Sequence, residues 1–123
     1  MSVIVLIEDD LFFSSKIENL LKSSNYEIHT ISKTEGLLDS LKQDIPDLIL
    51  INLASSNLNP LSIIPEIKNQ LNLRSIPIIG YCGHTQRELI EKALKLGCDK
   101  VLPNSVIVST LPKLLNQILQ PKL

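Results

Sequence analysis

The stretch DLILINLASSN, residues 47–57, decides the fold that this sequence predicts. It holds four consecutive large apolar residues, Leu48 to Ile51, and then changes abruptly to Asn52 and a polar loop. A short, uninterrupted apolar run is typical of a parallel β-strand that is covered on both faces. Strands in such sheets often end on residues that carry chemistry. The neutral amide of Asn52 at this place is therefore the first functional question.

Short apolar runs alternate with amphipathic stretches on both sides of this strand. The same patterns predict four more strands and five helices. The strands are expected at residues 3–7, 27–31, 76–82 and 100–103, and the helices at 10–24, 33–43, 60–73, 85–97 and 109–119.

Local signals set the expected ends of three of these helices. In residues 85–97, Thr85 and Glu88 form a capping box, and Gly97 is expected to end the helix. Helix 60–73 is predicted on the condition that Pro65 lies in its first turn, where a missing N–H is harmless. Pro112 is likewise expected near the start of the last helix.

Five strands that alternate with five helices predict an α/β fold with a doubly wound, five-stranded parallel sheet. The 123 residues are close to the commonest size of one domain, so we expect residues 1–123 to form a single domain. Sites in such sheets lie outside the carboxyl ends of the strands, where the strand order reverses. The residues of interest are therefore those that end the strands, Glu8 to Asp10, Asn52, Cys82 to His84 and residues 102–105.

Composition excludes several classes of function. Twelve basic and thirteen acidic residues leave a net charge of −1, so bulk charge gives no reason to expect nucleic acid or an anionic membrane as a partner. No apolar run approaches the ~20 residues of a membrane span, and the first residues lack the basic flank of a signal peptide. Cys82 and Cys98 show no C-x-x-C spacing. We expect a cytoplasmic protein.

Four stretches occur in an order that is similar to a known family. They are VIVLIEDD (3–10), IPDLILINL (45–53), SIPIIGYCG (75–83) and ALKLGCDKVLP (93–103). Over essentially its whole length the chain resembles the receiver domain of bacterial two-component response regulators. The resemblance implies a flavodoxin-like (βα)5 fold and a signalling module rather than an enzyme.

The resemblance also assigns roles to individual residues. Glu8 and Asp9 match the acidic pair that holds Mg²⁺ in the family. Asn52 falls on the phosphoacceptor aspartate, and Cys82 falls on the switch threonine or serine. Asn104 falls on the lysine that contacts the phosphoryl group. Only the acidic pair keeps its chemistry.

The altered residues predict a degenerate receiver that works without phosphorylation. An acyl phosphate needs a carboxylate nucleophile, whereas the Asn52 amide is neutral. Asn104 brings no positive charge to a phosphoryl group, and the Cys82 thiol is a weak hydrogen-bond donor. Loss of one carboxylate weakens the Mg²⁺ site, so we expect no cofactor and a metal-free pocket at Glu8 and Asp9. In such a pocket Asn52 would donate its NH₂ group to one of these carboxylates, and Asn52→Asp alone would regain Mg²⁺ affinity.

Two other functions remain open at this point. The alternative is a Mg²⁺-dependent phosphoacceptor with a displaced acceptor, Glu8 or Asp9. A third reading is a redox regulator that acts through Cys82.

The main prediction is a module that acts by protein–protein interaction, with a histidine kinase, another regulator or a copy of itself as partner. The resemblance places the interaction face on the fourth helix, fifth strand and fifth helix. Its predicted residues are Arg87, Glu91, Lys95, Lys100 and Ser109.

Overall fold

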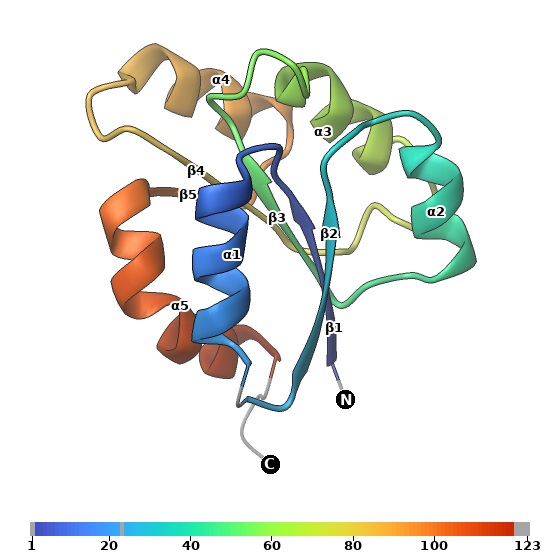
Figure 1. The fold of residues 1–123 in the computed structure, drawn as a ribbon. Helices are drawn as coiled ribbons and strands as arrows, with labels where there is room; N and C mark the ends of the chain where they lie inside the picture. Colours follow the sequence, from blue (N-terminus) through green and yellow to red (C-terminus); the bar gives the residue numbers. More distant parts are fainter. Residues whose placement is uncertain (1, 23, 120–123) are drawn as a thin grey trace.

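A computed structural model describes residues 2–22 and 24–119. Its five strands are all parallel and form one sheet with the order β2-β1-β3-β4-β5 (Figure 1). The strand order reverses at β1, so the crevice between β1 and β3 is the expected place for a site. The strands are β1 (Ser2–Ile7), β2 (Tyr26–Ile31), β3 (Leu48–Asn52), β4 (Ile78–Cys82) and β5 (Lys100–Pro103).

The helices cover both faces of the sheet. In Figure 1, α1 and α5 lie against one face, and α2, α3 and α4 lie against the other. This arrangement confirms the predicted doubly wound, flavodoxin-like fold. The helices are α1 (Leu11–Leu20), α2 (Leu37–Gln43), α3 (Pro60–Lys68), α4 (Arg87–Leu96) and α5 (Asn104–Leu119).

The central strands are apolar throughout because each face of the sheet has its own core. In β3, Leu48 and Leu50 pack with α1 and α5, whereas Ile49 and Ile51 pack with the helices of the other face. All four side chains are fully buried. Each contributes about 1.5–3 kcal/mol by leaving water, so a central strand has no position where a polar side chain is tolerated until its end.

The predicted strands agree with the structure within two residues, but the predicted starts of α5 and α2 were wrong, and α1 and α3 end at Leu20 and Lys68 instead of residues 24 and 73. Helix α5 begins at Asn104 instead of residue 109, because Ile107 and Leu111 are one turn apart and both are buried against α1 and the sheet. Pro112 therefore lies in the helix interior, on its exposed side. Helix α2 begins only at Leu37, because Gly36 before it adopts a left-handed conformation with φ 69°.

The expectations for α3 and α4 also need correction. Helix α3 begins at Pro60, so Pro65 lies in the second turn rather than the first. The capping box of Thr85 and Glu88 does not form. Gln86 is the residue that precedes α4, and its side chain instead accepts a hydrogen bond from the Gly83 N–H at 2.9 Å.

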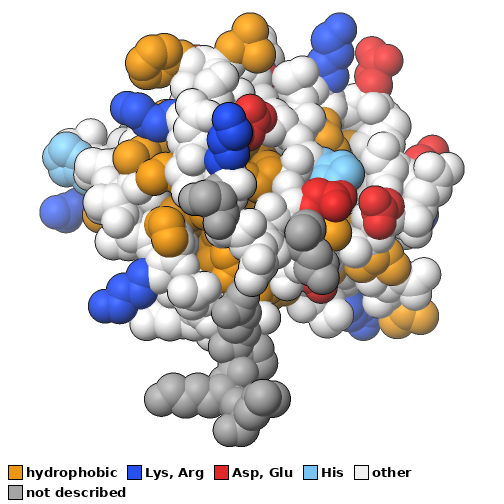
Figure 2. All heavy atoms as spheres, turned by 60° about the horizontal axis from the view of Figure 1, so that its bottom comes forward, with side chains coloured by type: hydrophobic (Ala, Val, Ile, Leu, Met, Phe, Trp, Pro, Cys, Tyr) orange, Lys and Arg blue, Asp and Glu red, His pale blue; other side chains and the backbone are white. Residues whose placement is uncertain are grey.

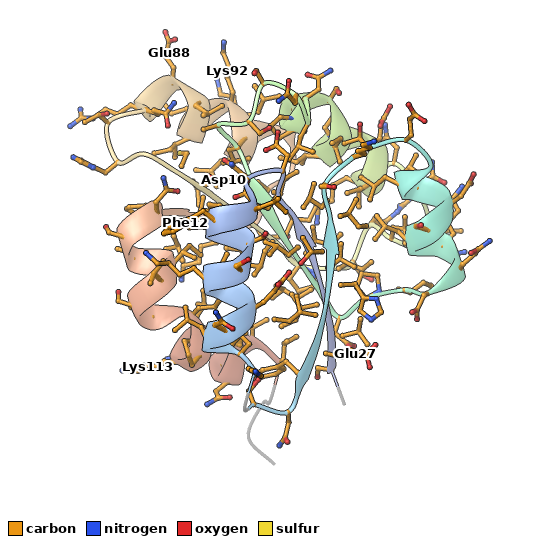
Figure 3. The ribbon with its side chains drawn as sticks, viewed as in Figure 1. Asp10, Phe12, Glu27, Glu88, Lys92 and Lys113 are labelled. Carbon is orange, nitrogen blue, oxygen red and sulfur yellow. The ribbon has the colours of Figure 1, made fainter. Side chains whose placement is uncertain are left out.

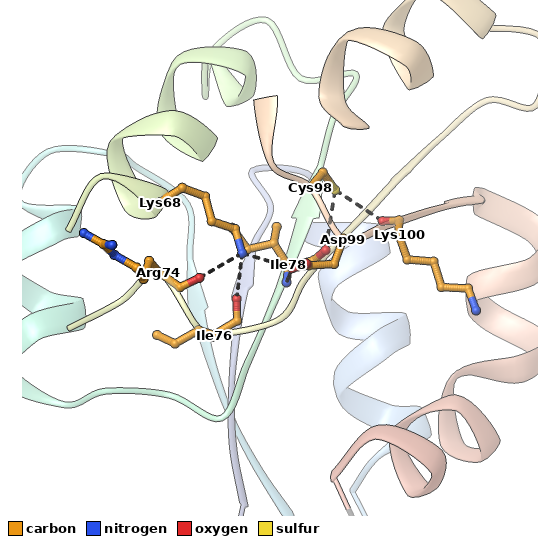
Figure 4. A network of polar contacts seen from close by, with 7 residues as sticks. All are labelled: Lys68, Arg74, Ile76, Ile78, Cys98, Asp99 and Lys100. Atoms are coloured by element: carbon orange, nitrogen blue, oxygen red, sulfur yellow. Dashed lines mark hydrogen bonds and ion pairs between the residues drawn. The ribbon is translucent and has the colours of Figure 1, made fainter. Parts of the chain in front are cut away.

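A lysine ties the connections at the amino ends of β4 and β5 together (Figure 4). The Lys68 ammonium donates to the backbone carbonyls of Arg74 and Ile76 at 3.2 and 3.3 Å and to the Asp99 carboxylate at 3.1 Å. The same Asp99 oxygen accepts the Ile78 N–H at 2.8 Å. This network holds the end of the sheet opposite to the predicted site, and we assign it a structural role.

The face at the amino ends of the strands carries side chains of both charges with hydrophobic side chains between them (Figure 2). It offers no surface of one sign, in keeping with the net charge of −1. Within residues 2–22 and 24–119, no helix has the length and apolar character needed to cross a membrane.

Candidate functional site

The ends of β1 and β3 bring Glu8 and Asn52 together. Ile7 and Ile51 are partners in the parallel register, so the residues that follow them lie side by side. The Asn52 Nδ2 donates to Glu8 Oε2 at 2.9 Å, and Asn52 Oδ1 accepts the Ala54 N–H at 2.9 Å. These two bonds fix the orientation of the amide. They confirm the prediction that Asn52 donates its NH₂ group to a carboxylate of the acidic pair.

The Glu8 carboxylate is buried, with only 1% of the residue exposed. Its Oε2 accepts the Asp10 N–H at 3.1 Å in addition to the Asn52 amide. Its Oε1 accepts the Tyr81 hydroxyl at 2.7 Å. Three protein donors therefore satisfy one buried charge, which is the condition for keeping such a charge inside a fold.

Tyr81 is the member of this site that sequence reasoning missed. It precedes Cys82 at the end of β4, and its hydroxyl is the one strong side-chain hydrogen-bond donor in that strand. A tyrosine hydroxyl next to a predicted strand end is the feature of the sequence that could have indicated a role for Tyr81 in the site. The Tyr81 ring packs against Phe13 of α1, with ring centroids 5.2 Å apart. Burial raises the pKa of Tyr81 far above its usual value, and the hydrogen bond to Glu8 adds to the shift, so the phenol remains a donor at neutral pH.

The other two acidic residues have separate tasks. Asp9 is partly exposed, and its Oδ2 accepts the Asn57 amide at 3.1 Å. Asp10 precedes α1, and its Oδ1 accepts the N–H groups of Phe12 and Phe13 at 2.9 and 3.4 Å. Asp10 is thus the N-cap of α1.

The remaining predicted pocket residues, Cys82 and Asn104, are not drawn into this network. Cys82 is fully buried in the layer under α2, α3 and α4, and burial raises the pKa of its thiol. Asn104 is exposed at the first position of α5. Among the hydrogen bonds of the described residues, none joins either side chain to Glu8 or Asn52.

The residues predicted for the interaction face all lie at the β5 edge of the sheet. Helices α4 and α5 flank β5 on opposite faces (Figure 1). On α4 the three predicted residues, Arg87, Glu91 and Lys95, repeat every four positions and so share one side of the helix. Leu94, which the prediction omitted, is 46% exposed on the same helix. The predicted residues are all exposed, namely Arg87, Glu91, Lys95, Lys100 and Ser109.

The family model described as the response regulator receiver domain matches residues 4–116. The chain belongs to the response regulator receiver family. Receiver domains are signalling modules of two-component systems that interact with histidine kinases and other regulators.

Individual relatives are similar over most of their length. The polar-differentiation response regulator DivK of Brucella ovis is 26% identical over 107 residues, which cover 85% of both chains. The solved receiver domain of the sensor histidine kinase PA1611 from Pseudomonas aeruginosa superposes with a TM-score of 0.84 at 24% identity, covering 97% of this chain and 98% of that one. The chemotaxis response regulator CheY4 of Vibrio cholerae gives a TM-score of 0.83 at 17% identity, with 96% and 98% covered.

The PA1611 receiver domain holds a magnesium ion in its active-site cleft, but the residues of this receiver do not fit such an ion. Mg²⁺ takes anionic oxygens in near-ideal octahedral geometry. Here both Glu8 oxygens already accept protein donors, and Asn52 turns its NH₂ group rather than an oxygen toward Glu8. In residues 2–22 and 24–119, no group of three or more His, Cys, Asp or Glu side chains is placed to hold a metal ion.

Proposed function

We propose that this receiver is a cytoplasmic signalling module that works without phosphorylation and acts by protein–protein contact. The observation that carries the proposal is the bond from Asn52 Nδ2 to Glu8 Oε2. At the end of β3, where the family resemblance puts the phosphoacceptor, the group that faces the acidic pair is a hydrogen-bond donor. An amide that donates to a carboxylate is neither a nucleophile for phosphate nor a ligand for Mg²⁺.

The surroundings of the pocket support the same proposal. Asn104 is a neutral side chain where the resemblance puts a lysine, so no ammonium balances a phosphoryl group there. Cys82 is fully buried, and its raised pKa favours the neutral thiol. A redox role would need an accessible thiolate, so the burial of Cys82 argues against it.

The geometry gives little support to a displaced acceptor. Glu8 is buried, and its oxygens accept three hydrogen bonds, so it cannot attack a phosphodonor without breaking them. Asp9 is partly exposed and is held by the exposed Asn57. Asp9 is therefore the residue on which the alternative depends.

The partner surface that we propose is the edge formed by α4, β5 and α5. Its exposed charges are mixed, because Arg87, Lys95 and Lys100 surround Glu91. Such a surface selects a protein partner by complementary charge rather than attracting a polyanion. In Figure 3, Glu88 and Lys92 point away from α4 into solvent, so the helix presents these charged side chains in addition to the predicted residues.

Treatment with acetyl phosphate and Mg²⁺, followed by intact mass measurement, tests the proposal. We expect no phosphate adduct on the wild-type chain. The matched positive control is the variant Asn52→Asp, Tyr81→Phe, Cys82→Thr, Asn104→Lys, which restores the residue types of the family and frees the Glu8 oxygen that the Tyr81 hydroxyl holds. Amide chemical shifts recorded with and without beryllofluoride give a second readout, and we expect them to stay unchanged in the wild type.

A phosphate adduct on the wild-type chain would refute the proposal. Mapping the adduct by peptide fragmentation then decides the alternative, since a displaced acceptor places it on Asp9 or Glu8. The variant Asp9→Asn should abolish an adduct on Asp9 and should leave a wild-type chain without an adduct unchanged.

A further inference from the structure

We propose that Tyr81 takes the place of the divalent cation in this receiver, because its hydroxyl and the Asn52 amide together hold the buried Glu8 carboxylate. The inference rests on the proposed function, since it explains how a receiver pocket keeps its shape without metal or phosphate. It adds a residue that the family resemblance does not single out, and it changes what a restored pocket requires.

The charge of Glu8 lies inside the protein. A carboxylate that is 99% buried needs either a cation or several hydrogen-bond donors, because the interior solvates charge poorly. Glu8 has no lysine, arginine or histidine within salt-bridge distance among the described residues. Its compensation consists of one hydroxyl, one amide and one backbone N–H.

Tyr81 makes the shortest of these bonds, at 2.7 Å, and it holds Oε1 alone. The other two donors share Oε2 at 2.9 and 3.1 Å. The Tyr81 bond is also the one that lies fully inside the protein, whereas the Asn52 amide is only partly buried. Tyr81 thus fixes the carboxylate so that one of its oxygens faces β4 and α1 rather than the mouth of the pocket.

This orientation explains why restoring the acceptor is not enough. From sequence alone, Asn52→Asp was expected to regain Mg²⁺ affinity by returning a third carboxylate. With Tyr81 in place, however, both Glu8 oxygens still accept hydrogen bonds, Oε1 from the Tyr81 hydroxyl and Oε2 from the Asp10 N–H. A metal must also compete with a hydroxyl for the electron density of the same carboxylate. We therefore infer that Tyr81 must be removed together with Asn52 before the site accepts Mg²⁺ well.

Tyr81 also connects the pocket to the start of α1. Its ring packs on Phe13, and its hydroxyl holds Glu8, which in turn holds the Asp10 N–H. Asp10 caps the helix whose first residue, Leu11, is 78% exposed. The network consequently fixes this end of α1 in one arrangement without any ligand.

The first experiment compares Mg²⁺ binding by isothermal titration calorimetry in the wild type, Asn52→Asp, Tyr81→Phe and the double variant. We expect no saturable binding in the wild type or in Tyr81→Phe. The double variant should bind Mg²⁺ about tenfold or more tightly than Asn52→Asp, because a hydrogen bond to a charged group is worth at least one factor of ten. Equal affinity of Asn52→Asp and the double variant would overturn the inference.

The second experiment asks whether the Tyr81 hydroxyl acts through the carboxylate. The chain has two tyrosines, and the Tyr26 hydroxyl donates to the neutral Asn116 amide at 2.7 Å, so Tyr26→Phe is the matched control. In metal-free urea unfolding, Tyr81→Phe should lower the midpoint more than Tyr26→Phe does. The effect of Tyr81→Phe should shrink in a Glu8→Gln background. An effect of the same size in both backgrounds would show that Tyr81 only packs, and the inference would fall.

Neither experiment uses a phosphodonor, so the inference and the proposed function fail separately. A phosphate adduct on the wild type would refute the proposed function, whereas the comparison of the two tyrosines would stand. Equal Mg²⁺ affinities of Asn52→Asp and the double variant, without an adduct on the wild type, would refute only the inference.

Discussion

A single Asn→Asp change at the end of β3 should destabilise this receiver strongly when metal is absent. Asn52→Asp replaces a donor, 2.9 Å from a buried Glu8 oxygen, with a second carboxylate. Two like charges about 4 Å apart repel by about 4 kcal/mol at an effective dielectric constant of about 20. The lost bond to a charged group adds about 1.5–3 kcal/mol. Rotation of the new side chain toward water relieves part of this sum, so we expect the free energy of unfolding to fall by about 3 kcal/mol.

The chain contains a matched control for this change. Asn57 donates to Asp9 at 3.1 Å, but both residues lie in a more exposed place. Because water screens exposed charges, Asn57→Asp should cost less than about 1 kcal/mol. Urea unfolding of both variants in buffer with EDTA at neutral pH measures the difference. If Asn52→Asp were within about 0.5 kcal/mol of Asn57→Asp, the buried Glu8–Asn52 contact would not have the role that we give it.

The pH dependence of the same variant has a definite sign. Two carboxylates this close cannot both ionise easily, so the folded variant holds a proton that the unfolded chain releases. The folded state of the variant is therefore favoured as the pH falls. The difference in free energy of unfolding between wild type and Asn52→Asp should shrink below about pH 5. A difference that grows over the same range would contradict this account.

Three further predictions concern parts of the fold away from the pocket. Lys68→Met removes the donor of three hydrogen bonds but keeps the apolar stem, so it should lower the free energy of unfolding by about 2 kcal/mol. The control Lys92→Met, on the solvent side of α4, should change this free energy by less than about 0.5 kcal/mol. Equal effects of the two variants in thermal unfolding would show that the Lys68 network is not structural. Gly97→Ala should destabilise by about 1–2 kcal/mol, because φ is +118° and an added Cβ would lie 2.8 Å from the Lys68 side chain; an unchanged urea midpoint would contradict the left-handed cap. Burial raises the pKa of the Cys82 and Cys98 thiols in the folded protein. The free energy of unfolding should therefore be constant below the ordinary thiol pKa of about 8.5 and should fall as the pH rises above it. Both thiols should react with iodoacetamide only as fast as the protein opens.

Much of this fold could be predicted from the sequence because the signals are local. The apolar run from Leu48 to Ile51 indicates a strand covered on both faces by its composition alone, and helical spacing marks the segments between strands. Alternation of the two leads to a doubly wound parallel sheet, and that topology places Glu8 beside Asn52 at the strand ends. Even the direction of the Asn52 amide followed from chemistry, since a neutral amide beside carboxylates has to donate.

Helix starts depended on tertiary packing. Residues 104–108 read as a loop, yet they form the first turns of α5 because Ile107 is buried against α1 and the sheet. The capping box of Thr85 and Glu88 matches a common pattern, but the loop before α4 is held by Gln86 instead. Local propensity is weak, of the order of a few tenths of a kcal/mol per residue, and burial of one large side chain exceeds it several-fold.

The sequence by itself thus determined the sheet and its two cores, because both depend on the hydrophobic pattern. It predicted that Asn52 donates to one carboxylate of the acidic pair, and the structure decided that this partner is Glu8. Only the tertiary structure decided that Tyr81 completes the pocket. Glu8 directly follows β1, and Tyr81 lies 73 residues later on β4, with β3 between these two strands. Their contact depends on the twist of the sheet, the packing of Phe13 and the exact direction of one side chain, and no local pattern in the sequence encodes these three together.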